Sequence, residues 1–207
     1  MCNFDKSLIR DVNIIIVDND VCRTAESVVN ELIEKNVTEH EISYFSYPVK
    51  GLSNVRNELL KNGLEHNPDF LVFVDDDEYV SPDWLNELVG TILTNNGDMT
   101  MGPVNSKVSS NVPGYISCWL ERDDYFNNTI LDFIRTGNLI IRAKSILERN
   151  IWFDPRFNKT GGEDSYFGLQ MIKKGATVYW ASNAIVWETV PDSRANISLA
   201  PEVLSPK

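Results

Sequence analysis

The stretch FLVFVDDDEYVSPDWL, residues 70–85, contains the sharpest change of character in this chain of 207 residues. Residues 70–74 are all apolar, which predicts a short buried strand, and four carboxylates follow at 75–78. Ser81-Pro82 is a typical helix start, and the apolar residues after it recur at helical spacing: Leu85, Leu88, Val89, Ile92 and Leu93. The stretch therefore predicts a strand, an acidic turn and a helix.

Strands and helices alternate on both sides of this stretch. Upstream, we predict strands at 12–17 and 42–47 and helices at 25–36 and 53–63. Downstream, the same patterns predict strands at 99–104, 139–141, 177–180 and 185–187, and helices at 143–147 and 163–174. Residues 105–114 show no clear period, which predicts a loop.

This alternation predicts an α/β fold with a mostly parallel central sheet and helices on both faces. The continuous apolar run at 12–17 is typical of a strand that is buried on both faces. Ligands of such sheets bind beyond the carboxyl ends of the strands, which is where Asp18 and Asp75 stand. The length favours a single domain, placed at 1–200, with a frayed tail at 201–207.

Composition and charge exclude several classes of function. With 19 Lys and Arg against 30 Asp and Glu, the formal charge is −11, so the clustered cations that nucleic-acid binding requires are missing. No window approaches the ~18 consecutive apolar residues of a membrane span, and the start shows no secretory signal. The three cysteines are odd in number and widely spaced, which favours a reducing compartment. We therefore expect a cytoplasmic protein.

The carboxylates at 75–78 are the first candidates for chemistry. Neighbouring ionised groups disfavour one another unless a cation or hydrogen bonds compensate. Oxygen ligands of this kind suit Mg²⁺ or Mn²⁺. The simpler interpretation is a solvated Asp-rich turn, and the segment alone favours neither.

Three further segments combine glycine with polar residues. Thr160–Asp164 runs into a helix start, so its two carboxylates serve either as a helix cap or as a general base on a mobile loop. Residues 50–57 would present backbone amides and Arg56 to an anion at a helix N-terminus. Thr136-Gly137-Asn138 precedes a strand and is, at its simplest, a turn.

Taken together, these segments resemble the family 2 glycosyltransferases of the GT-A fold, in the branch of short bacterial polysaccharide enzymes. The resemblance covers about Val12 to Arg194, and its motifs occur in the family's order. They are IIIVDND, PVKGLSNVRN, FLVFVDDDEYVSPDWL, TGNLIIR, FDPRFNKTGGEDSYFGLQMIKKG and VWETVPDSR. The resemblance implies transfer of a sugar, with inversion, from a nucleotide-diphosphate donor, expected to be a UDP-sugar. The acceptor would be a hydroxyl of a saccharide or lipid-linked saccharide.

The resemblance also implies a role for individual residues. Asp75 and Asp77 match the ends of the Asp-x-Asp motif, which holds Mn²⁺ or Mg²⁺ against the diphosphate, with Asp77 as the first choice for direct contact. Many relatives have a late metal-binding histidine, and here Glu188 stands in that segment, so either Glu188 substitutes for it or the site uses only the Asp-x-Asp ligands. Asp164 matches the catalytic base, with Glu163 as the second candidate. The residues implied in donor binding are Asp18, Arg56, Asp75, Asp76, Thr136, Gly137 and Asn138.

Family members begin with a further strand and helix before the segment that matches Val12, and only eleven residues precede it here. We therefore expect a domain that lacks the family's first strand, with unpaired backbone groups along the neighbouring strands. The alternative function is a non-catalytic or degenerate remnant that binds nucleotide sugars. A phosphatase that uses Asp75 and Asp77 as nucleophile and acid is a third, weaker alternative.

The resemblance also bears on acceptor and location. Trp119, Tyr125 and Phe126 lie where the family has its acceptor region, and flat apolar faces suit sugar rings, although such residues are more often core. A lipid-linked acceptor would bring the protein, as a peripheral protein, to the inner face of the cell membrane. No nucleic-acid partner is expected.

Overall fold

The computed structural model describes residues 5–107 and 124–190, so the predicted tail at 201–207 and Trp119 lie outside the described residues. In the first range the elements are β1 (Asn13–Asp18), α1 (Glu26–Glu34), β2 (Glu41–Ser46), α2 (Leu52–Glu65), β3 (Phe70–Val74), β4 (Glu78–Val80), α3 (Trp84–Thr94), β5 (Met99–Met101) and β6 (Val104–Lys107). In the second they are β7 (Ile130–Leu131), β8 (Asn138–Arg142), α5 (Ala143–Arg149), the 3₁₀ turn η1 (Pro155–Phe157), α6 (Glu163–Lys173), β9 (Val178–Trp180) and β10 (Val186–Thr189).

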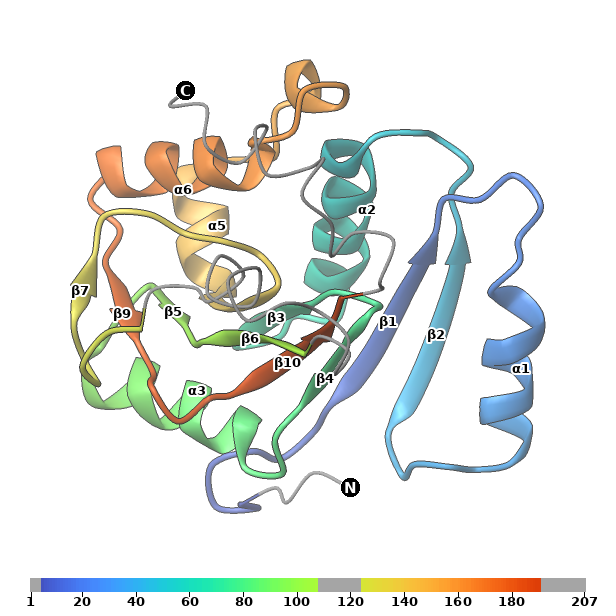
Figure 1. Ribbon diagram of the computed structural model, residues 1–207, viewed down its shortest axis with the longest axis horizontal. Helices are drawn as coiled ribbons and strands as arrows, with labels where there is room; N and C mark the ends of the chain where they lie inside the picture. The colour runs from blue at the N-terminus through green and yellow to red at the C-terminus, as the bar shows by residue number, and fades with distance from the viewer. Residues whose placement is uncertain (1–4, 108–123, 191–207) are drawn as a thin grey trace.

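Five strands form the central sheet, in the order β3-β8-β5-β9-β7. Figure 1 shows α3 on one side of this sheet and α2, α5 and α6 on the other. Buried apolar residues follow the same division. One core cluster contains Leu60, Phe153 and Phe167 from the side of α2 and α6, and the other contains Leu85, Leu88 and Ile92 of α3. The predicted α/β fold with helices on both faces is confirmed.

The prediction of a mostly parallel sheet is wrong, because the sheets are mixed. In the central sheet only β5 and β9 run parallel, whereas β3–β8, β5–β8 and β7–β9 are antiparallel. An apolar strand has the same sequence pattern in either direction when helices cover both faces, so the pattern did not report the direction. The antiparallel register places Asn138, at the start of β8, opposite Val74, at the end of β3.

The predicted strand at 99–104 is two strands that belong to different sheets. The chain leaves the central sheet after β5, and Gly102-Pro103 separates it from β6. There β6 pairs in parallel with β10, and β10 pairs antiparallel with β4. This small sheet continues directly from the acidic stretch, because β4 begins at Glu78.

The strand predicted to be buried on both faces is only partly buried. β1 pairs in parallel with β2, and within residues 5–107 and 124–190 no ladder forms along its other edge. Asn13 and Ile14 are exposed, and burial increases toward Asp18. An apolar run predicts that a strand is buried by other elements. Whether one or both of its faces are buried depends on the rest of the fold.

Asp98 links α5 to the residue that precedes β9, and its lowered pKa makes a testable contribution to stability. Its carboxylate accepts hydrogen bonds from Ser145 Oγ (2.6 Å) and the Thr177 amide (2.9 Å) and lies 3.1 Å from an Arg149 nitrogen. Burial alone would raise the pKa of Asp98, but the bonds from Ser145 and Thr177 and the charge of Arg149 outweigh it and lower that pKa.

Because the folded-state pKa is lowered, the stabilisation is present above the unfolded value and is lost as the pH falls through the folded value. We expect Asp98→Asn to lower the free energy of unfolding by about 1–3 kcal/mol at pH 7. The difference in unfolding free energy between wild type and Asp98→Asn should become smaller below about pH 4. Urea denaturation of both proteins at pH 7 and pH 3.5 measures it. A deficit that is equal at the two pH values would contradict the charged role, and Asp69→Asn, at an exposed position, is the matched control.

Candidate active site

The acidic stretch forms a tight turn at the end of β3. The Asp75 amide donates to Glu78 Oε2 (2.9 Å), and the Glu78 amide donates to the Asp75 carbonyl (3.2 Å). The chain then enters β4, while the side chains of Asp76 and Asp77 are exposed. The four carboxylates therefore surround a closed turn at the edge of the central sheet, and Glu78 folds back over its start.

Gly137 brings a second loop against this turn. A Cβ atom at Gly137 would lie 2.6 Å from Glu78 Oε1 and 3.3 Å from Asp75 Oδ2. Only glycine permits this approach without displacing the carboxylates. The antiparallel β3–β8 pairing, in which Val74 lies opposite Asn138, brings this loop to the acidic stretch.

Arg56 connects the acidic turn to the start of α6. This side chain, from α2, is 12% exposed, forms an ion pair with Glu163, and has a nitrogen 3.9 Å from Asp75 Oδ1. Its guanidinium also lies 5.8 Å from the centre of the Phe153 ring. The Glu163 side chain is only 3% exposed, and its second oxygen has no hydrogen-bond partner in the described part of the chain. The positive charge of Arg56 therefore compensates the negative charge of the buried Glu163 carboxylate.

The two adjacent carboxylates at the start of α6 lie in different environments. Gly161 (φ 72°) and Gly162 (φ 87°) adopt left-handed conformations that set the helix start. Glu163 then points inward to Arg56, whereas Asp164 is half-exposed and its Oδ1 accepts a hydrogen bond from the Ser165 amide (2.7 Å). Glu163 thus belongs to a buried ion pair, whereas Asp164 is accessible to solvent.

The pKa of Asp75 shows that these carboxylates form one electrostatic cluster. Burial raises that pKa most, the charge of Arg56 opposes the rise, and Asp77, Asp76 and Asp164 raise it further. Asp164 therefore lies close enough to the acidic turn to act on it, although it is 89 residues away in sequence. A cation placed among these groups would relieve their mutual repulsion.

The small sheet brings Glu188 beside the last residue of the acidic stretch. In the antiparallel β4–β10 pair, Glu188 stands directly opposite Glu78. Like charges in this position repel one another unless other groups compensate them. Among residues 5–107 and 124–190, no group of three or more His, Cys, Asp or Glu side chains is already gathered in a geometry that could hold a metal ion.

A comparison of sequences identifies the family. The sequence model described as "Glycosyl transferase family 2" matches residues 6–147, which is more than half of the chain. The chain belongs to glycosyl transferase family 2. A curated relative, the succinoglycan biosynthesis protein ExoM of Rhizobium meliloti (strain 1021), is 34% identical over 196 residues. The match covers 90% of this chain and 60% of ExoM, so the chain spans less than two thirds of that relative's length.

Solved structures confirm the GT-A fold of this family 2 chain. The S. aureus TarS fragment 1–349 in complex with UDP-GlcNAc aligns with a TM-score of 0.64 at 17% identity, covering 92% of this chain and 52% of the TarS fragment. GalNAc-T7 with UDP, GalNAc and Mn²⁺ aligns with a TM-score of 0.62 at 14% identity, covering 86% of this chain and 38% of GalNAc-T7. No helix in the described part of the chain is long and apolar enough to cross a membrane.

Asp18, which the family resemblance places at the donor, has its carboxylate hydrogen-bonded within the protein. Asp18 accepts hydrogen bonds from the Asp20 amide (2.8 Å), the Ala25 amide (3.3 Å) and the Tyr44 hydroxyl (2.7 Å). The bond from the Asp20 amide and then that from Tyr44 lower the pKa of Asp18. Asp18 thus shapes the turn between β1 and α1.

Asn138 is buried and acts as a structural link. Its amide nitrogen donates to the Pro103 carbonyl (3.0 Å) and the Ala184 carbonyl (2.6 Å), and its oxygen accepts from Trp84 Nε1 (2.8 Å). Thr136 is also buried, and its hydroxyl has no partner among the described residues. In this loop, therefore, Gly137 is the residue that faces the carboxylates.

Two residues beside the site, Glu78 and Asn158, were not predicted from the sequence. Glu78 received no role of its own, although it folds over Asp75 and contacts the Gly137 loop. Asn158, which directly follows η1, accepts a hydrogen bond from the Asn54 amide (3.3 Å). Its side chain therefore binds a backbone amide at the N-terminus of α2 that the sequence predicts to face an anion. Only Glu78 had a visible signal, as the fourth member of a carboxylate run. Asn158 is 104 residues from its partner.

Proposed function

We propose that this chain is the catalytic part of a glycosyltransferase that moves a sugar from a UDP-sugar to a hydroxyl of a saccharide or lipid-linked saccharide, with inversion. The observation that carries the proposal is the approach of Arg56 and Gly137 to the acidic turn after β3, where the charge of Asp164 also acts on Asp75. Family membership supports it, as does the similarity to ExoM, a succinoglycan biosynthesis protein. TarS has been crystallised with UDP-GlcNAc and with UDP, which favours a uridine nucleotide.

In this proposal Asp164 is the base, and Glu163 is not. Asp164 removes the proton from the acceptor hydroxyl while that oxygen forms its bond to the anomeric carbon, and the bond to the diphosphate breaks on the opposite face. The half-exposed position of Asp164 suits contact with substrate, whereas the ion pair with Arg56 commits Glu163 to the protein interior. Donor binding is assigned to Asp18, Arg56, Asp75, Asp76 and the loop of Thr136, Gly137 and Asn138.

A divalent cation, Mn²⁺ or Mg²⁺, fits the chemistry of the residues that are present. Asp75, Asp77 and Glu188 would hold it, since such ions take one or two carboxylates together with water and substrate phosphates. Burial raises the pKa of Asp75 most, and the charges of Asp77 and Asp76 raise it further, which is a repulsion that a cation would relieve. Bound there, the cation would neutralise charge on the leaving diphosphate. GalNAc-T7, of similar fold, was crystallised with Mn²⁺.

The alternative is a protein that binds the donor without turnover, and activity separates the two. Such a protein would bind a UDP-sugar but release no UDP from it, with or without Asp164. The cytoplasmic location and the peripheral association with a membrane stay predictions.

The first test is a thermal-shift titration with UDP, GDP and ADP, each with Mn²⁺ or with EDTA. At ligand about 100-fold above its dissociation constant, binding should stabilise the protein by about 2.7 kcal/mol, which is on the order of 5–10 °C at this size. We expect the shift with UDP and Mn²⁺, and its loss in EDTA and in Asp77→Asn. Asp83→Asn, at an exposed position outside the cluster, is the matched control and should keep it. A stable protein that shifts with no nucleotide would contradict the proposal.

A further inference from the structure

Asn57, in α2, forms two hydrogen bonds with the backbone of Phe153, although 96 residues separate them in sequence. Its amide nitrogen donates to the Phe153 carbonyl (2.8 Å), and its oxygen accepts from the Phe153 amide (2.8 Å). Residues 151–154 belong to no helix or strand, so regular structure does not supply these partners to a residue that is only 1% exposed. Asn57 therefore fixes both backbone groups of Phe153 at once.

Two neighbours of this asparagine in α2 hold the same segment. Ser53 is buried, and its hydroxyl donates to the Asp154 carbonyl (2.8 Å). The Asn54 amide donates to Asn158 Oδ1 (3.3 Å). The irregular segment 153–158, which precedes α6, is thus attached to α2 through several hydrogen bonds.

The ring of Phe153 joins the two parts of the proposed active site. It stacks on Phe167 of α6, with ring centres 4.3 Å apart and planes 15° apart. It also lies edge-on to Phe73 of β3, with ring centres 6.1 Å apart. Phe167 comes one helical turn after Asp164, and Phe73 comes two residues before Asp75. Phe153 therefore lies between the helix with the proposed base and the strand that ends in the acidic turn.

The loop before α6 gives the first turn of this helix little support. Residues 159–162 are exposed, and a Cβ atom at the first of the two glycines would meet none of the described residues within 4 Å. The buried side chains near the helix start are Glu163, which pairs with Arg56, and Phe167, which forms the ring stack. Both contacts lead to Phe153, because the Arg56 guanidinium also lies over its ring, 5.8 Å from the centre.

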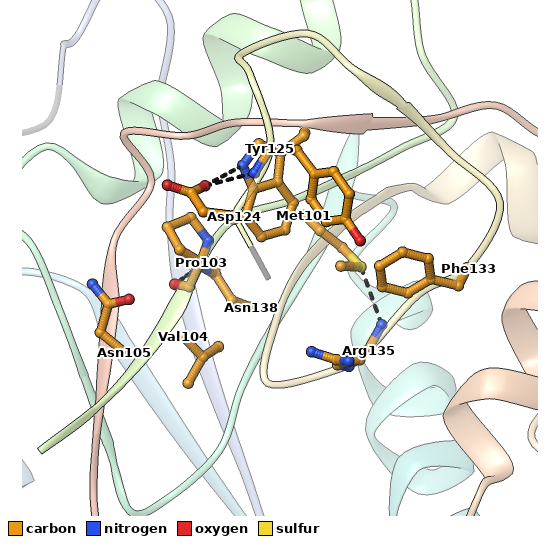
Figure 2. Close-up of a pocket in the computed structure, with 11 residues that line it drawn as sticks. Met101, Pro103, Val104, Asn105, Asp124, Tyr125, Phe133, Arg135 and Asn138 are labelled. Carbon is orange, nitrogen blue, oxygen red and sulfur yellow. Dashed lines mark hydrogen bonds between the residues drawn. The ribbon is translucent and has the colours of Figure 1, made fainter. Parts of the chain in front are cut away.

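A separate contact holds α6 further along. A Cβ atom at Gly168 would lie 2.3 Å from Ile134, so the helix packs directly against that side chain. Figure 2 shows Phe133 and Arg135, the chain neighbours of Ile134, lining a small pocket, with the Arg135 amide donating to Met101 Sδ (3.1 Å). This bond ties the segment to β5. The helix is therefore fixed at its second turn, and the position of its first turn depends on other contacts.

We propose that Asn57 is a positioning residue for the sugar transfer, a role that rests on the proposed function. By fixing Phe153, it sets the place of the first turn of α6 and so the position of Asp164 relative to the acidic turn. An asparagine suits this role because its side chain carries an acceptor and donors in one plane, as a peptide group does. A base must lie within hydrogen-bond reach of the hydroxyl, and a misplacement of about 1 Å is enough to slow a reaction strongly.

Amide hydrogen exchange of the full chain, followed by mass spectrometry of its peptides, tests the link without any substrate. We expect Asn57→Ala to raise the exchange rate about tenfold or more in peptides that cover 151–167, because both partners of the Phe153 backbone are lost. Exchange in α3 should not change. Asn62→Ala is the matched control: Asn62 is buried in the same helix and donates to the Glu58 carbonyl (2.7 Å), one turn earlier. It should leave exchange at 151–167 at the wild-type rate.

Kinetics test the consequence for transfer. The donors are UDP-glucose, UDP-galactose and UDP-N-acetylglucosamine, each with Mn²⁺, and UDP release is measured with water or saccharide as acceptor. We expect Asn57→Ala to lower kcat by about 10- to 100-fold and to leave KM for the donor close to the wild-type value. In the Asp164→Asn background the same change should cost little more, because an amide takes no proton wherever it lies. Asn62→Ala should keep the wild-type kcat.

A second variant keeps the test valid if Asn57→Ala does not fold. Asn57→Asp keeps the size of the side chain and the acceptor for the Phe153 amide, but its second oxygen repels the Phe153 carbonyl. We expect this variant to lower kcat by about tenfold, again with little change in KM.

The outcomes separate this proposal from the proposed function. Wild-type exchange or wild-type kcat in the Asn57 variants would overturn the positioning role. Losses that multiply with that of Asp164→Asn would also overturn it, because independent effects indicate general damage to the site and not a displaced base. A wild type that binds UDP but releases none from any donor would contradict the proposed function itself, and with it the part of Asn57 in transfer.

Discussion

Replacing Asp164 by asparagine is expected to lower donor turnover by about 10²- to 10⁴-fold, the usual contribution of a general base. The amide keeps the size of the side chain but cannot take a proton. Binding of UDP should change little, because Asp164 is assigned to the acceptor hydroxyl and not to the nucleotide. The rate of UDP release from the UDP-sugar that binds most tightly, with water or saccharide as acceptor, measures the effect.

Two outcomes would argue against this role for Asp164. Full turnover by Asp164→Asn would remove the base assignment. A wild type that binds the donor but releases no UDP with any acceptor would favour the binding protein without turnover. Asp83→Asn is the matched control for the loss of one exposed carboxylate and should keep the wild-type rate.

Replacing Arg56 by leucine is expected to lower the free energy of unfolding by about 3–5 kcal/mol, because it leaves Glu163 buried without a compensating charge. The physical basis is the burial of both partners, which are 12% and 3% exposed. The double variant Arg56→Leu/Glu163→Leu removes both charges, and we expect it to recover a large part of the loss. Chemical denaturation of wild type, the two single variants and the double variant completes the cycle.

The Lys144–Glu148 pair on α5 is the matched control for this cycle. Its side chains are 76% and 59% exposed, so its coupling should be at most about 1 kcal/mol. A coupling between Arg56 and Glu163 no larger than that of the exposed pair would contradict the buried ion pair. In that case Glu163 would again be a candidate for the base.

Local patterns in the sequence were sufficient for most elements of the fold. The helices at 26–34, 84–94 and 163–173 agree with their predictions to within a few residues, because apolar spacing and turn residues report which face of a helix is buried. The short strands β4 and β7 were missed. Segments of two or three residues are too short to show a period.

Strand pairing could not be predicted in the same way. Val74 pairs with Asn138 across 64 residues, and neither residue type specifies that partner. The same limit applies to the buried ion pair, since Arg56 and Glu163 are separated by 107 residues. Such contacts depend on how helices and strands pack, which a local pattern does not contain.

By itself, the sequence determined that this is an α/β protein with an acidic turn after a buried strand, and its ordered motifs identified the family. Both follow from local chemistry, namely apolar periodicity, turn residues and runs of like charge. The tertiary structure alone decided the direction of the strands, the approach of Gly137 to Asp75, and the different environments of Glu163 and Asp164. The physical reason is that burial and charge pairing are properties of neighbours in space, and here those neighbours lie many tens of residues apart.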